Sequence, residues 1–149
     1  MERRIIGVGP GIGMRAYGVA WVAAAVVFLG LDAVWLSLSA SRLYRPLLGG
    51  LLREDFLLLP AALFYLIYTI GIVVFAISPA LGTGRWSPAG LRGLFLGLFG
   101  YSVYDLTNQA TLRDWPISVA IADLIWGTLL TAVAAVAGSL AARAVRITG

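Results

Sequence analysis

Four long apolar segments constrain this chain more than any other feature of its sequence. They are residues 16–38, 56–84, 93–112 and 115–142. The only charged residues inside them are Asp32, Asp105 and Asp123. A transmembrane helix needs about 20 mostly apolar residues to cross a hydrocarbon core of roughly 30 Å. Backbone groups in lipid must hydrogen-bond within the protein, and the short alternating segments of a β-barrel are missing. We therefore predict an all-α membrane protein.

The four segments predict an antiparallel bundle of four transmembrane helices with both termini on the same side. The expected helices cover approximately residues 16–38, 56–82, 88–111 and 115–142. The connections are too short to hold another domain, so one membrane domain should cover residues 16–142. It is preceded by a basic segment, residues 1–15, and followed by a tail, residues 143–149. The first apolar segment is longer than the roughly 7–15 residues of a signal peptide core, so we expect it to remain as a helix.

The arginines are distributed unequally between the two sides of the membrane. Seven of the eleven lie on the side of the termini: Arg3, Arg4, Arg15, Arg85, Arg92, Arg143 and Arg146. The positive-inside rule therefore predicts that both termini are cytoplasmic. We expect this basic cytoplasmic face to bind anionic lipid headgroups. Nucleic acid is not an expected partner for so few and so scattered arginines.

The residue types that are missing exclude several kinds of chemistry. None of the 149 residues is Cys, His or Lys. Thiol catalysis, zinc sites built from Cys and His, His-ligated haem, imidazole bases and Lys Schiff bases are therefore excluded. We expect no cofactor. Any proton or ion chemistry must use carboxyl, hydroxyl, amide or guanidinium groups.

The three acidic residues inside the predicted spans should lie at one depth in the membrane. Asp32 and Asp105 come after the middle of their helices, whereas Asp123 comes before the middle of a helix that runs the opposite way. At 1.5 Å per residue, each lies on the order of 5–10 Å from the midplane, in the half away from the termini. A charged side chain facing lipid would cost about 3 kcal/mol or more. We therefore expect all three to face the interior of the bundle.

These acids and their polar neighbours form a candidate ligand site. The site consists of Asp32, Asp105, Asn108, Asp123, Tyr65, Tyr68, Tyr101, Tyr104 and Trp126. Arg42, Arg45 and Arg113 lie in the flanking connections and are candidate charge partners of the acids. The pattern does not indicate a particular metal. A structural alternative is that Asp, Asn and Tyr side chains only hydrogen-bond across a tight bundle, at about 0.6–2 kcal/mol per bond.

Several motifs resemble a family of small bacterial membrane proteins, domain-of-unknown-function family 2177. They include "LDAVWL" at 31–36, "YRPLLG" at 44–49, "YDLTNQATLRDWP" at 104–116 and "DLIWG" at 123–127. The similarity extends over residues 16–142, and the motif at 104–116 is its most specific part. The resemblance implies a four-span protein of the bacterial inner membrane. It implies no activity.

Three functions are compatible with the sequence. The first is a binding or translocation protein whose polar site holds a proton, a small cation or a polar ligand. The second is a non-catalytic accessory subunit that packs in a larger membrane complex or homo-oligomer. The third is a lipid-modifying enzyme with an Asp general base and Arg42 or Arg45 on a phosphate. We rank the enzyme last, because the chain lacks His, Cys and any recognised catalytic motif.

Overall fold

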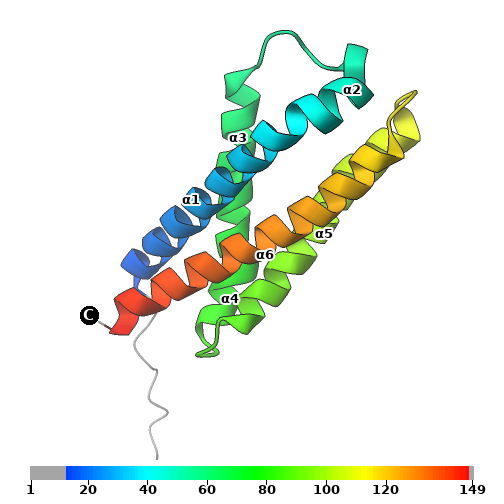
Figure 1. Cartoon of the computed structure of the whole chain (residues 1–149). Helices are drawn as coiled ribbons and strands as arrows, with labels where there is room; N and C mark the ends of the chain where they lie inside the picture. Colours follow the sequence, from blue (N-terminus) through cyan, green and yellow to red (C-terminus); the bar gives the residue numbers. More distant parts are fainter. Residues whose placement is uncertain (1–12, 148–149) are drawn as a thin grey trace, which may run out of the picture.

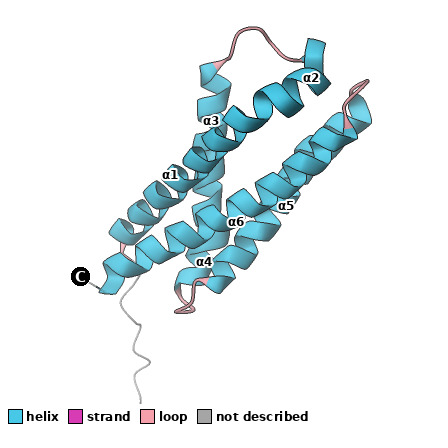
Figure 2. Ribbon diagram, viewed as in Figure 1, coloured by secondary structure: helices cyan, strands magenta, loops and turns pink. Residues whose placement is uncertain are grey.

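The structure, a computed structural model, describes residues 13–147 of the chain. Most of the basic segment expected at 1–15 and the end of the tail expected at 143–149 lie outside the described residues. Within the described range every regular element is helical (Figure 2). This confirms the all-α fold that the apolar segments predict.

The helices form four long rods (Figure 1). The first consists of α1 (Met14–Ser39), the π-helical segment η1 (Ala40–Tyr44), α2 (Arg45–Leu48) and the 3-10 turn η2 (Gly49–Leu51). The second consists of α3 (Leu58–Gly71), the π-helical segment η3 (Ile72–Ile77) and α4 (Ser78–Leu81). The third and fourth are the single helices α5 (Ser87–Thr111) and α6 (Ile117–Ile147).

Both π-helical segments lie just before a proline. Pro46 is the second residue of α2, which follows η1, and Pro79 is the second residue of α4, which follows η3. A proline inside a helix removes an amide donor, and its ring clashes with the carbonyl group four residues earlier. A wider π-helical turn relieves this crowding, so the helical path continues past the proline. The first rod therefore extends to Leu51, although the sequence pattern predicted a connection from residue 39.

Three of the rods are long and apolar enough to span a membrane. They are Met14–Leu51, Leu58–Leu81 and Ile117–Val145. The remaining rod, α5, has 25 residues but a less apolar sequence that includes Arg92 and Asp105. The fold is thus a membrane bundle of four helices in which α5 has the weakest membrane signal.

The long helix α6 lies between α1 on one side and α5 on the other (Figure 1). The start of α1, the α4–α5 connection and the end of α6 lie at one end of the bundle, which we call the terminal end. Ala16, Leu81 and Ala142 pack together there. The opposite end, which holds α2 and the α5–α6 connection, is called the distal end.

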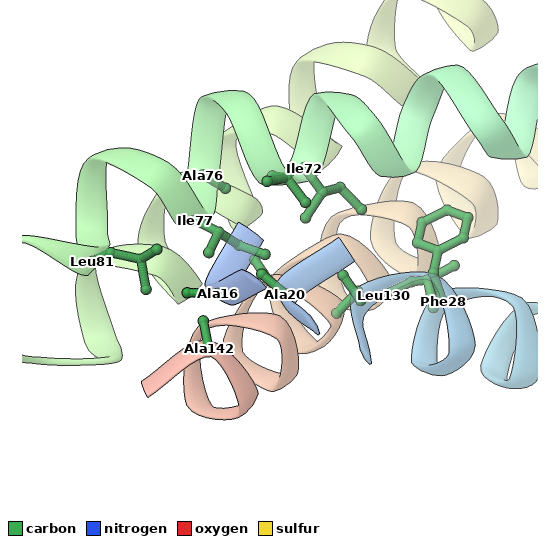
Figure 3. Close-up of a cluster of buried hydrophobic side chains, with 13 residues drawn as sticks. Ala16, Ala20, Phe28, Ile72, Ala76, Ile77, Leu81, Leu130 and Ala142 are labelled. Atoms are coloured by element: carbon green, nitrogen blue, oxygen red, sulfur yellow. The ribbon is translucent and has the colours of Figure 1, made fainter. Parts of the chain in front are cut away.

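The apolar core fills the terminal half of the bundle (Figure 3). Its largest members are Phe28, Ile72, Ile77, Leu81 and Leu130, and alanines occupy much of the remaining core. On α1 the buried residues recur every four positions and form one stripe: Ala16, Ala20, Ala24, Phe28 and Asp32. The helix face that builds the core therefore ends on a carboxyl group as it reaches the distal half.

Glycines bring α5 and α6 into backbone contact. A Cβ atom added at Gly97 would lie only 2.5 Å from the carbonyl oxygen of Gly127, and one added at Gly93 would lie 2.7 Å from the Cβ of Ala135. Small residues at such positions let transmembrane helices approach closely. The Gly93 and Gly97 pair, which the sequence shows as a small-residue motif, therefore has a packing role.

Candidate functional site

A cavity of about 550 Å³ lies in the distal half of the bundle, between α1, α3, α5 and α6. Its walls combine aromatic rings with two carboxyl groups. The lining residues are Asp32, Trp35, Leu36, Tyr44, Phe64, Tyr68, Gly100, Tyr101, Tyr104, Asp123 and Trp126. Cavities of about 300–1,000 Å³ are typical of small-molecule sites. Six of the nine residues in the candidate ligand site predicted from the sequence line this cavity: Asp32, Tyr68, Tyr101, Tyr104, Asp123 and Trp126.

Asp32 reaches the cavity from the end of the buried stripe of α1, and only 8% of its surface is exposed. The hydroxyl group of Tyr65 on α3 donates a hydrogen bond of 2.6 Å to its Oδ2. The indole nitrogen of Trp126 on α6 donates a hydrogen bond of 3.3 Å to its Oδ1. Both donors are neutral, so hydrogen bonds satisfy this carboxyl group without neutralising it.

Asp123 reaches the cavity from α6 and also bonds to a tyrosine. The hydroxyl group of Tyr44, in η1, donates a short hydrogen bond to Oδ1 of Asp123. That hydroxyl group in turn accepts a hydrogen bond of 2.9 Å from the indole nitrogen of Trp35. Leu48 of α2 packs against Trp115 and Val119, which holds this segment against the start of α6. The helical continuation of α1, η1 and α2, thus lies against the bundle, and its residue Tyr44 forms part of the cavity wall.

Two stacked indole rings link the surroundings of the two acids. The rings of Trp35 and Trp126 lie 4.7 Å apart at an interplanar angle of 12°. Trp126 binds Asp32, and Trp35 binds the tyrosine that holds Asp123. Each indole ring is therefore held both by a hydrogen bond and by its neighbour. These contacts fix the orientation of both rings in the cavity wall.

The wall contributed by α5 depends on the glycine contact with α6. The ring of Tyr101 packs directly on Gly127, where any added Cβ atom would collide with it. Tyr101 also meets the ring of Tyr68 edge to face at 6.3 Å. The hydroxyl group of Tyr68 lies 3.0 Å from that of Thr131. Tyr104, which is 55% exposed, forms the outer rim of this wall.

The third acid is placed differently from the other two. Asp105 is fully buried, does not line the cavity, and accepts no hydrogen bond from the described residues at either carboxyl oxygen. Asn108, one turn further along α5, is half-buried and also lies outside the cavity lining. The structure therefore separates Asp105 and Asn108, two residues of the predicted site, from the cavity wall.

The three arginines proposed as charge partners lie on the surface. Arg42, Arg45 and Arg113 are exposed, and the hydrogen-bond donors to the two cavity acids are tyrosines and a tryptophan instead. Among the residues that the structure describes, the cavity lining contains no basic side chain. A role for these arginines near the site stays a prediction.

Sequence reasoning missed two residues that organise the site. Trp35 follows Asp32 by three positions, so the helical repeat could have placed both on one face. No comparable signal identified Tyr44, because its position depends on the helical path continuing through η1.

The described residues also contain no group of three or more acidic, His or Cys side chains that could hold a metal ion. The described residues of the site thus form an aromatic cavity with two acids in its wall.

Comparison with known proteins gives a family match. The family described as "Predicted membrane protein (DUF2177)" matches residues 17–140, which is most of the chain. Searches of curated proteins and of solved structures give no match. The resemblance read from the sequence motifs is thereby confirmed, and so is the location of the protein in a membrane.

Proposed function

The chain belongs to the DUF2177 family of predicted membrane proteins, and we propose that it binds and moves a cation or polar ligand through the distal cavity. One observation carries this proposal. A cavity inside a membrane bundle has two carboxyl groups in its wall and, among the described residues, no basic side chain. Ionisable residues inside membrane spans mark ligand and ion pathways more often than they serve packing alone.

The hydrogen bonds at the two acids support binding over a purely structural role. A buried carboxylate that serves packing is usually neutralised by a basic partner, because an uncompensated charge in a low dielectric is costly. Here the donors are Tyr65, Trp126 and Tyr44, which orient the carboxyl groups and supply no positive charge. A positively charged or hydrogen-bonding ligand would complete the electrostatic balance of the cavity.

We also propose that α5 is a fourth span and that the protein lies in a bacterial inner membrane with cytoplasmic termini. The excess of arginines at the terminal end supports this orientation, and it places the cavity in the outer half of the bilayer. Fusions of green fluorescent protein and alkaline phosphatase after residue 149 test the topology. A fluorescent and phosphatase-inactive C-terminus is expected, and the reverse pattern would overturn the orientation.

Ligand-dependent thermal shift tests the binding function. The full chain, purified in mild detergent, is melted with chloride salts of Na⁺, K⁺, guanidinium and choline at constant ionic strength. At least one of these cations should raise the melting midpoint. Asp32→Asn and Asp123→Asn should remove that rise. In proteoliposomes with a gradient of the same cation, the wild type should transport that cation, and neither variant should do so.

The matched control is Asp55→Asn. It removes one negative charge from an exposed residue in the α2–α3 connection, so the rise should persist. Circular dichroism and size-exclusion profiles establish that each variant is folded. The binding function is rejected if no cation shifts the wild type, or if all three variants respond as the wild type does.

A further inference from the structure

We infer that the ligand of the distal cavity is a small organic ammonium cation rather than a bare metal ion. This inference rests on the proposed binding function and names its ligand class. It comes from the joint geometry of the aromatic rings and the two carboxyl groups. Seven of the eleven lining residues are aromatic, whereas aromatic residues make up 11% of the whole chain. The cavity is therefore selectively aromatic and not merely apolar.

Aromatic faces are the groups that bind ammonium cations. The negative face of an indole or phenol ring attracts a cation held within about 6 Å, and the attraction grows when water is excluded. Recognition of quaternary ammonium groups by several such rings around one space is a recurrent use of this interaction. Trp35, Trp126 and Tyr101 come from three helices and line the same cavity, so several rings are available around one space.

The carboxyl groups supply the charge that a cation needs. Both oxygens of Asp32 already accept hydrogen bonds. On Asp123, by contrast, Tyr44 occupies Oδ1, and no described residue donates to Oδ2. An ammonium group in the cavity would find at Asp123 a carboxylate oxygen that is still free to accept. It would also sit beside aromatic rings, which interact with its alkyl groups.

A bare metal ion fits the same cavity poorly. Ca²⁺ takes six to eight oxygen ligands and Mg²⁺ six, at distances of about 2.0–2.6 Å. The described residues place two acids on the cavity, and they contain no cluster of three or more metal-binding side chains. A volume of about 550 Å³ is also far more than an ion of that size requires. Size and ligand count both favour an organic ligand.

The probe pair that tests this class is choline and 3,3-dimethylbutan-1-ol, the uncharged compound in which carbon replaces the nitrogen of choline. Binding of each to the full chain in detergent is measured by calorimetry and by quenching of tryptophan fluorescence. We expect choline to bind at least ten times more tightly than its neutral counterpart. Equal affinity for the two compounds would overturn the inference, because it would indicate an apolar pocket that ignores charge.

A pair of variants at Tyr101 tests the aromatic wall itself. No described residue forms a hydrogen bond with the hydroxyl group of Tyr101, so Tyr101→Phe keeps the ring and should keep choline affinity within about twofold. Tyr101→Leu removes the ring and should weaken choline binding at least fivefold. Equal choline affinity in the two variants would count against the inference. If Tyr101→Leu does not fold, the probe comparison on the wild type decides.

The thermal melts with inorganic cations and the choline titrations together separate failure of the ligand class from failure of the binding function. If Na⁺ or K⁺ raises the melting midpoint in an Asp123-dependent way and choline does not bind, the cavity binds a cation of another class. The ammonium inference then falls, and the binding function remains. If neither the inorganic cations nor choline bind, both fall.

Discussion

The contact between α5 and α6 makes a quantitative prediction at Gly97. A Cβ atom at this position would lie 2.5 Å from the carbonyl oxygen of Gly127 and 2.8 Å from the Cα of Thr128. Both are backbone atoms, so no side-chain rotation can make room. Ordinary contacts begin at 3.4 Å, so the helices would have to separate by about 0.9 Å at this point, from 2.5 to 3.4 Å. Gly97→Ala should therefore destabilise the bundle.

The expected magnitude follows from the cost of forcing extra atoms into a packed interface. Overpacking by one or two carbons typically costs about 1–3 kcal/mol. In a membrane bundle the loss is not offset elsewhere, because close packing is itself the main force between helices. For a chain of this size, 1 kcal/mol corresponds to about 2–4 °C in melting temperature. Gly97→Ala should therefore lower the midpoint by about 2–12 °C.

The measurement is thermal unfolding of the purified full chain in detergent, followed by circular dichroism. Gly30→Ala is the matched control, because a Cβ atom at Gly30 would meet nothing within 4 Å. Alanine has a higher helix propensity than glycine, by about 1 kcal/mol, so Gly30→Ala should melt at or above the wild-type midpoint. If Gly97→Ala has the same melting midpoint as Gly30→Ala, the close contact between the helices is absent and the packing explanation is refuted.

Further predictions concern the buried polar groups, and all are checked by the same melts. Tyr44→Phe should lower the stability by about 1–3 kcal/mol, because Asp123 loses its donor while it stays partly buried. Tyr65→Phe should cost less, because Asp32 keeps the hydrogen bond from Trp126; an equal or larger loss would contradict this account. Asp105→Asn should leave the midpoint unchanged or raise it, because it replaces a buried carboxyl group that has no partner among the described residues. A fall of more than about 4 °C, or about 1 kcal/mol, would reveal a partner for Asp105.

The membrane fold could be predicted because it depends on averages over long segments. A span of about 20 apolar residues tolerates errors of several positions, and four such spans leave little choice of architecture. The sequence also placed Asp32 and Asp123 at one depth, because the rise per residue of a helix is constant. Both of these acids line the distal cavity.

The details of the site depended on rotation and on local geometry, which averages do not capture. The sequence predicted Asp105 at the depth of Asp123, yet Asp105 lies outside the cavity lining. The rotation of α5 about its own axis decides whether Asp105 faces the cavity. An approximate helical wheel does not determine that rotation. Tyr44 could not be placed at all, because the first apolar segment ends at residue 38 and the sequence predicted a connection from residue 39. The π-helical segment carries the helical path past Pro46 and brings Tyr44 to Asp123.

The weak membrane signal of α5 follows from its part in the site. Its outward residues are large and apolar: Phe95, Phe99, Val103 and Leu106 are all exposed. Its inward positions are the small residues Gly93 and Gly97, which the contact with α6 requires, and the tyrosines that wall the cavity. These glycines and tyrosines lower the average hydropathy of the helix, in addition to the contributions of Arg92, Asp105, Asn108 and Gln109. The helix that length and composition favour least as a span is therefore the one whose sequence is most constrained by packing and by the cavity.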